Sequence, residues 1–257
     1  MLTLIPIPAF TDNYLWLLHD GQRALVVDPG DAAPVLRKLA ELKLKLDAIL
    51  VTHHHADHTG GVDELRHATS AKVYGPATEN IPKPYDMLGE GDVVHAAGVD
   101  FRVIDVPGHT AGHIAYYAPG VDGKPLLFCG DTLFSAGCGR LFEGTPAQML
   151  ASLDKLAALP GNTVVCCTHE YTLSNLRFAV AVDPANQDLA NYQAHCIELR
   201  KHNQPTLPTS VSQELLINPF LRTRHSALIS SARQFDASAL DDTSVFAAIR
   251  QWKNQFK

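Results

Sequence analysis

Four potential metal ligands lie within six residues of this chain, in the stretch THHHADH at residues 52–58, and no other feature constrains the fold as strongly. The preceding residues 47–51 are apolar and partly β-branched, which predicts a buried strand. Gly60-Gly61 and the amphipathic stretch 62–68 predict a helix after the loop. The histidines therefore lie where a strand ends and a helix begins, which is the edge of an α/β layer where ligands usually bind.

Three later strands are expected to end in further ligands, namely His109, Asp131 and His169. Strand alternation predicts that His53 and His55 point the same way and that His54 points elsewhere. Imidazole and carboxylate groups suit zinc, and also iron and manganese. Seven ligands exceed what one tetrahedral ion uses, so we expect two metal ions that share one carboxylate. We expect structural or solvated roles for His19, His54, His67, His95, His195, His202 and His225.

Composition excludes several classes of protein. The 257 residues suit one large domain or one and a half, and the net charge of -6 argues against nonspecific nucleic-acid binding. The five cysteines are scattered without a Cys-x-x-Cys pair, which favours buried thiols in a reducing compartment such as the cytoplasm. The N-terminus lacks the basic start of a signal peptide, and no apolar run reaches the roughly 18 residues of a membrane helix.

The chain changes character near residue 172. Before it, strands are expected at residues 2–8, 14–18, 24–27, 72–75, 101–106, 113–117, 125–129 and 163–167, the first three as an antiparallel meander. Helices are expected from a cap at Asp31 to about residue 44, and from a capping box at Thr145 to about residue 159. Residues 79–91 are expected to be a loop. Beyond residue 172 we expect helices at 174–182, 189–202 and 244–256 and an extended stretch at about 206–220.

The ligand pattern resembles the metallo-β-lactamase superfamily over about residues 1–172. This resemblance implies an α+β fold: a four-layer αββα sandwich that carries the metals at one edge, followed by a small all-α C-terminal domain. The expected domains are therefore a catalytic domain at residues 1–172 and a helical glutathione-binding domain at residues 173–257.

Four other motifs resemble the glyoxalase II (hydroxyacylglutathione hydrolase) family: CGRLFEGT at 138–145, THEYT at 168–172, NPFLR at 218–222 and AIRQWKNQF at 248–256. The resemblance implies that His53, His55 and His109 hold one metal. It likewise implies that Asp57, His58 and His169 hold the other, with Asp131 as the bridge. The positions expected to bind glutathione are Arg140, Phe142, Tyr171, Arg250 and Lys253. Phe142 stands where many relatives have tyrosine, which removes one hydroxyl donor.

The implied reaction is hydrolysis of S-(2-hydroxyacyl)glutathione thioesters by a metal-bridging hydroxide. The implied substrate is S-D-lactoylglutathione, which yields glutathione and D-lactate in the second step of methylglyoxal detoxification. Asp57 and Asp131 are the expected catalytic residues, and two divalent ions, zinc with iron or manganese as alternatives, are the expected cofactors. Arg250 and Lys253 lie three residues apart on an expected helix, so both can face one substrate carboxylate. We expect a cytoplasmic monomer that binds neither nucleic acid nor membrane.

Two alternatives to the thioester hydrolase remain. The first keeps the fold but changes the chemistry, to a one-iron persulfide dioxygenase or a lactonase. The second is a non-enzymatic sensor or scaffold. The complete set of seven ligands and the helical C-terminal segment favour the thioester hydrolase.

Overall fold

The computed structural model describes residues 1–256, which form two compact units. The first unit contains residues 1–105 and 111–130, and the second contains residues 106–110 and the described chain from Asp131 onward. The segment 106–110 thus belongs to the second unit, although the first unit surrounds it in sequence. The domain boundary at residue 172 stays a prediction.

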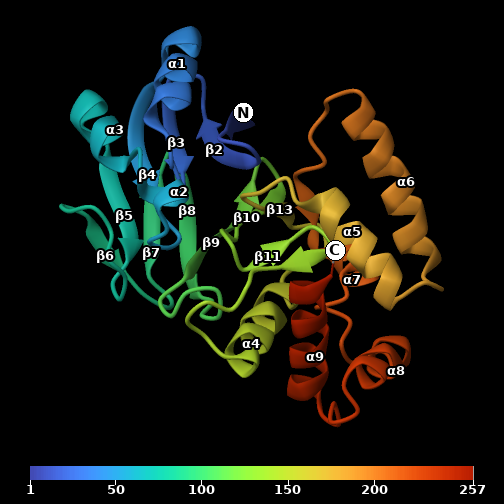
Figure 1. Cartoon of the computed structure of the whole chain (residues 1–257). Coiled ribbons are helices and arrows are strands. Elements are labelled where there is room, and N and C mark those ends of the chain that lie inside the picture. The colour runs from blue at the N-terminus through green and yellow to red at the C-terminus, as the bar shows by residue number, and fades with distance from the viewer. Residues whose placement is uncertain (257) are drawn as a thin grey trace. The chain divides into compact units, whose positions relative to one another are not determined.

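A six-stranded sheet in chain order forms the base of the first unit (Figure 1). The first three strands are antiparallel, as predicted, and the rest are parallel: β1 Thr3–Ala9, β2 Asn13–His19, β3 Arg23–Val27, β4 Lys45–Leu50, β5 Lys72–Pro76 and β6 Asp86–Leu88. The prediction that residues 79–91 are a loop was wrong at β6, because three residues are too short to show a periodic pattern.

Helices cover one face of this sheet, namely α1 Ala32–Leu42 and α3 Val62–Thr69 (Figure 1). The predicted cap of α1 is confirmed, since the Asp31 side chain accepts a hydrogen bond from the Ala33 amide at 2.9 Å. Val35 and Leu39 of α1 and Leu65 of α3 pack with sheet residues in one buried cluster. Apolar stripes at helical spacing thus fix both helices on the sheet.

The first unit also contains an antiparallel run of four strands, in which neighbours in sequence pair with one another: β7 Val93–Ala96, β8 Val99–Asp105, β9 Ile114–Val121 and β10 Lys124–Phe128. Tyr116 of β9 is buried, and its hydroxyl donates to the Val51 carbonyl at 2.9 Å, which ties these strands to the end of β4. This bond anchors the segment that leads into the histidine loop.

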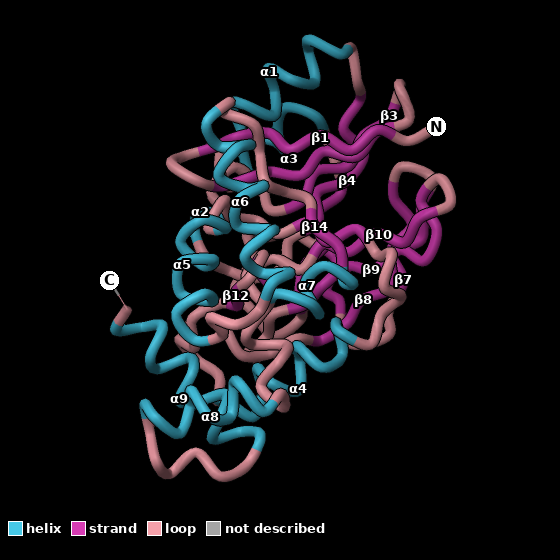
Figure 2. Tube along the Cα trace, turned by 90° about the vertical axis from the view of Figure 1, so that its right-hand side faces the viewer, coloured by secondary structure: helices cyan, strands magenta, loops and turns pink. Residues whose placement is uncertain are grey.

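The second unit is mainly helical: β11 Leu133–Phe134, β12 Gly137–Cys138, α4 Pro146–Ala157, β13 Val164–Cys166, α5 Thr172–Val182, α6 Gln187–Lys201, β14 Thr209–Ser210, α7 Val211–Ile217, α8 Ser226–Phe235 and α9 Asp242–Gln255. Helices α4, α8 and α9 lie together, as do α5, α6 and α7 (Figure 2). The capping box at Thr145 is confirmed.

One prediction for the C-terminal part was wrong: the stretch 206–220 is not simply extended, because α7 lies within it. The described part beyond residue 172 is helical as predicted, apart from the two-residue strand β14, which pairs with β13. Helix α8 was not predicted. Its N-cap, His225, makes no side-chain capping bond, so the usual start signal is missing there.

A buried carboxylate joins α7 to the β11–β12 hairpin. Glu214 accepts hydrogen bonds from the Ala136 amide at 2.8 Å and from the Ser135 hydroxyl at 3.0 Å, and Asn218 and Thr209 donate to it as well. Burial raises its pKa. These bonds compensate for the cost of burying the group and hold the hairpin that leads to Cys138 and Arg140.

Candidate functional site

The histidine loop of the first unit follows β4 and includes the short helix α2 Ala56–Thr59. His53 and His58 are fully buried, and their rings lie 4.0 Å apart between centroids. Nε2 of His53 lies 3.1 Å from Nδ1 of His55, which agrees with the expectation that these two side chains point the same way. Four candidate ligands are therefore held together by one loop.

Asp28, which ends the neighbouring strand β3, orients two of these histidines. Its carboxylate accepts the Thr52 amide at 2.7 Å and the Thr52 hydroxyl at 2.8 Å, and it faces Nδ1 of His58 at 3.2 Å. Because the Thr52 hydroxyl donates to Asp28, it accepts from Nδ1 of His53 at 3.1 Å. The contact with Thr52 favours a proton on Nδ1 of His53, and the nearby Asp28 carboxylate favours the same tautomer of His58, which leaves both Nε2 lone pairs for a metal.

Asp57 receives its own support from the β1–β2 hairpin. The Asn13 side-chain amide donates to Oδ2 of Asp57 at 3.1 Å. The loop also packs against residue 30 without space for a side chain, because a Cβ atom at Gly30 would lie 1.9 Å from the Asp57 carbonyl oxygen. Glycine is required there so that the two loops can approach each other.

Two further histidines have structural positions around the loop. Nδ1 of His54 lies 2.9 Å from the buried Glu79 carboxylate, which also accepts the His54 amide at 2.6 Å, so this side chain points away from His53 as expected. His113 is fully buried and stacks on His53 with ring centroids 4.6 Å apart. It thereby restricts the rotation of the His53 ring.

The second unit groups the three remaining candidate ligands around Asp131. One carboxylate oxygen lies 3.3 Å from Nε2 of His109, and the other lies 3.4 Å from Nε2 of His169. Nδ1 of His109 donates to the Arg140 carbonyl at 2.9 Å, which fixes the tautomer that leaves Nε2 as a ligand. Asp131 thus presents one oxygen to each of two imidazoles, as a bridging carboxylate does.

The distances within each cluster fit metal ligation better than direct ion pairing. The separations between imidazole nitrogen and carboxylate oxygen are 3.4 Å for His58–Asp57 and 3.3 and 3.4 Å for the two contacts of Asp131. Two ligand atoms that share one tetrahedral zinc ion at ordinary bond lengths lie about 3.3 Å apart. A charge-assisted hydrogen bond would be about 2.7–2.9 Å. The donor sets of both units therefore suit divalent metals.

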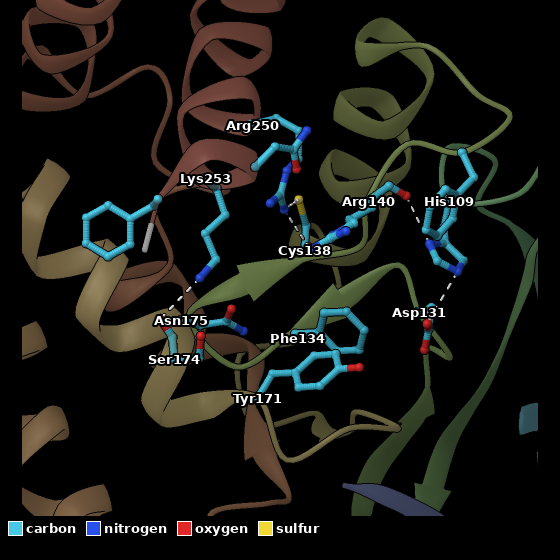
Figure 3. Close-up of a pocket in the computed structure, with 13 residues that line it drawn as sticks. His109, Asp131, Phe134, Cys138, Arg140, Tyr171, Ser174, Asn175, Arg250 and Lys253 are labelled. Atoms are coloured by element: carbon cyan, nitrogen blue, oxygen red, sulfur yellow. Dashed lines mark hydrogen bonds and ion pairs between the residues drawn. The ribbon is translucent and has the colours of Figure 1, made fainter. Parts of the chain in front are cut away.

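A pocket of about 480 Å³ in the second unit begins at His109 and Asp131 (Figure 3). All five residues that were expected to bind glutathione line it: Arg140, Phe142, Tyr171, Arg250 and Lys253. The structure also adds lining residues that were not among the expected substrate-binding positions: Phe134, Cys138, Ser174, Asn175, Asn254 and Phe256. One pocket thus joins the carboxylate of a candidate metal ligand to the cations of the C-terminal helix.

The end of the pocket opposite Asp131 is strongly cationic. Arg250 is buried, donates to the Cys138 carbonyl at 2.9 Å and stacks 4.9 Å over the Phe220 ring. Lys253 donates to the Ser174 carbonyl at 3.1 Å. Burial, together with the charges of Arg250, Arg177 and Arg140, lowers the pKa of Lys253 to about 8. A bound carboxylate would relieve this repulsion.

Aromatic side chains flank the candidate metal ligands of the second unit. The Tyr171 ring stacks on His169 with centroids 4.7 Å apart, and Phe142 lies edge-on to His109 at 5.2 Å. Phe142 is 62% exposed, so its ring is available for stacking on a ligand. The Cys138 thiol is not a candidate nucleophile, because burial raises its pKa.

Comparison with known proteins assigns the family. A model of the metallo-beta-lactamase superfamily matches residues 10–169, and a model described as "Hydroxyacylglutathione hydrolase C-terminus" matches residues 170–256. The hydroxyacylglutathione hydrolase of Albidiferax ferrireducens is 64% identical over 255 residues, which cover 99% of this chain and 100% of the relative. The chain belongs to the hydroxyacylglutathione hydrolase family. The same enzyme from Cupriavidus taiwanensis is 56% identical, with 100% of both chains covered.

The expected fold class is confirmed by structural similarity. The crystal structure of the B3 metallo-β-lactamase BLEG-1 matches with a TM-score of 0.62 and 27% identity, and covers 86% of this chain and 99% of that one. Membership of this superfamily implies a divalent-metal site, for which both clusters offer suitable donors. No helix within residues 1–256 has the length and apolar character needed to cross a membrane.

Proposed function

We propose that the protein hydrolyses S-(2-hydroxyacyl)glutathione thioesters, with S-D-lactoylglutathione as substrate and D-lactate and glutathione as products. The observation that supports this most directly is the pocket of the second unit, which joins Asp131 and His109 to a cationic end formed by Arg250 and Lys253. A glutathione thioester has a matching layout, since its reacting carbonyl is attached to the central cysteine and lies several bonds away from the glycine carboxylate. We further propose that it acts as a cytoplasmic monomer in methylglyoxal detoxification.

The proposed metal assignment combines the ligands of both units. His53, His55 and His109 would hold one ion and Asp57, His58 and His169 the other, with Asp131 between them. When bound, such ions lower the pKa of water so that hydroxide is present near neutral pH, and they neutralise charge that develops on a carbonyl oxygen. The donor chemistry favours zinc, and iron and manganese are the alternatives.

The remaining tasks fall to side chains of this chain. Arg250 and Lys253 bind the substrate carboxylate, with Arg140 adding positive charge along the pocket. Tyr171 stacks on His169 and Phe142 lies edge-on to His109, and with the substrate bound these rings would shield the reacting end from water. A thiol with a pKa near 8.5 leaves readily as the thiolate, so no dedicated general acid is required.

The deciding experiment combines a thioesterase assay with metal analysis. Purified protein is expected to contain two metal equivalents and to release thiol from S-D-lactoylglutathione. Removal of the metals with a chelator should abolish thiol release, and readdition of zinc should restore it. A protein that carries both metals but releases no thiol from this substrate contradicts the proposal.

The charge of Lys253 is expected to set the upper pH limit of substrate binding. This amine is cationic below its pKa of about 8 and loses its charge as the pH rises through that value. The KM for S-D-lactoylglutathione should therefore rise by roughly tenfold above pH 8, because the carboxylate loses a charged donor. Initial rates measured between pH 6.5 and 9.5 give this profile.

Two variants isolate the contribution of Lys253. Lys253→Arg keeps the positive charge throughout this range, so its KM should stay flat. Lys253→Ala should show the high KM at every pH, with kcat little changed because the residue lies away from the reacting carbonyl. If the KM of Lys253→Arg rises with pH as steeply as that of the parent protein, a group other than Lys253 causes the titration.

A further inference from the structure

An exposed aromatic residue occupies the turn between β1 and β2. The register pairs Ala9 with Asn13, so Phe10, Thr11 and Asp12 form the connection. Phe10 is 61% exposed and has a φ of 50°, in the left-handed region of backbone conformation. A bulky aromatic residue is uncommon there, because its Cβ atom crowds the following carbonyl group.

This conformation suggests a role other than stability. Residues held in sparsely populated conformations gather at ligand-binding and active sites, where the surrounding structure enforces them. Asparagine or glycine would adopt this turn with less strain, and the hairpin buries less than half of the phenyl ring. The side chain at position 10 is therefore not explained by the needs of the fold alone.

Phe10 lies beside a proposed metal ligand of its own unit. A Cβ atom at Gly30 would lie 2.8 Å from Cε2 of Phe10 and 1.9 Å from the Asp57 carbonyl oxygen, so the ring edge and the Asp57 main chain are neighbours. The same turn ends in Asn13, which donates to the Asp57 carboxylate at 3.1 Å. One turn thus supports Asp57 and presents an exposed phenyl ring next to it.

We infer that Phe10 is a specificity-determining residue that contacts the acyl group of the thioester. This inference rests on the proposed function. On the proposed metal assignment, Asp57 is one of the ligands at which the thioester carbonyl reacts. The acyl group is attached to that carbonyl, so it lies among the same ligands, where Phe10 offers an apolar surface. Phe10 then favours acyl groups with larger apolar or aromatic substituents.

The test compares two substrates that share glutathione and a 2-hydroxyacyl group but differ in apolar size: S-mandeloylglutathione and S-D-lactoylglutathione. In Phe10→Asn the ratio of their kcat/KM values, mandeloyl over lactoyl, should fall roughly threefold to tenfold. Asparagine tolerates the left-handed conformation, so the turn is preserved. Inhibition by S-methylglutathione, which has no acyl group, should be unchanged.

Control variants distinguish a direct contact between Phe10 and the acyl group from a general disruption of the site. Phe10→Leu keeps an apolar side chain and should retain most of the ratio. Val93 on β7 is 61% exposed as well, and Val93→Thr should leave the ratio unchanged. An unchanged ratio in Phe10→Asn, or equal losses for both substrates, overturns the inference. A parent protein without thioesterase activity overturns the proposed function too, whereas an active parent with an unchanged ratio refutes the role of Phe10 alone.

Discussion

Replacement of Asp131 by asparagine should lower kcat by about a thousandfold or more and reduce the bound metal by at least one equivalent. Asp131 presents one carboxylate oxygen to His109 and the other to His169. Asparagine has the same shape but offers a single acceptor oxygen and a donor NH₂ group in place of the second. It therefore cannot bridge two metals. Elemental analysis and steady-state kinetics on the same preparation measure both effects.

A surface pair provides the matched control. Asp100 lies 2.7 Å from His95, and both side chains are largely exposed. Asp100→Asn makes the same chemical change beside a histidine, and we expect neither metal content nor kcat to change, because exposed ion pairs contribute little. An Asp131→Asn protein that keeps both metals and activity within tenfold of the parent would exclude Asp131 as the bridge.

Removal of the Asp28 carboxylate should weaken both the fold and the metal site. Asp28 is buried, accepts two hydrogen bonds from Thr52 and faces Nδ1 of His58. In Asp28→Ala the buried Thr52 amide and hydroxyl lose their acceptor, which should cost roughly 3 kcal/mol of unfolding free energy. Loss of a group that orients a ligating histidine typically weakens metal binding by about 10- to 100-fold. Urea unfolding of the metal-free protein and metal titration measure these two quantities.

Asp28→Asn separates the two effects. Its amide oxygen can still accept the Thr52 amide, and asparagine tolerates the φ of 51° at this position. Its NH₂ group, if turned to His58, disfavours a proton on Nδ1. Only the Thr52 hydroxyl then loses its acceptor, so unfolding stability should fall less than in Asp28→Ala, whereas metal affinity should fall as far. If Asp28→Ala and Asp28→Asn both bind metal as tightly as the parent protein, Asp28 does not orient His58.

Local patterns in the sequence predicted strands β1 to β5 of the first sheet and the grouping of candidate ligands on the loop after β4. The alternation of His53 and His55 and the strand before them were readable, because both depend on residues near in sequence. The side chains that support this loop could not be predicted in this way, because Asp28 and Asn13 contact it from 24 and 44 residues away in the sequence. The sequence of residues 28–31 looked like an ordinary turn, and only the parallel pairing of β3 with β4 brings Asp28 to Thr52.

The C-terminal part shows a different limit. Ser210 caps α7 by accepting the Gln213 amide, and the spacing Ser-x-x-Gln was visible in the sequence. The prolines at 205 and 208 favoured an extended interpretation of this stretch, and α7 is short enough to follow them without conflict. The pocket-lining residues Ser174 and Asn175 could not be predicted, because a serine or asparagine on a helix carries no signal of the cavity it faces.

The pocket of the second unit draws its lining from both sides of the boundary between the two family models. His109, Asp131 and the segment 134–142 precede residue 170, whereas Tyr171 and the residues of α5 and α9 follow it. Recombination at that boundary would therefore combine the β11–β12 hairpin of one parent with the cationic helix α9 of another. Chimaeras between relatives should exchange thiol preference only when residues 131–142 and the C-terminal helices are inherited together.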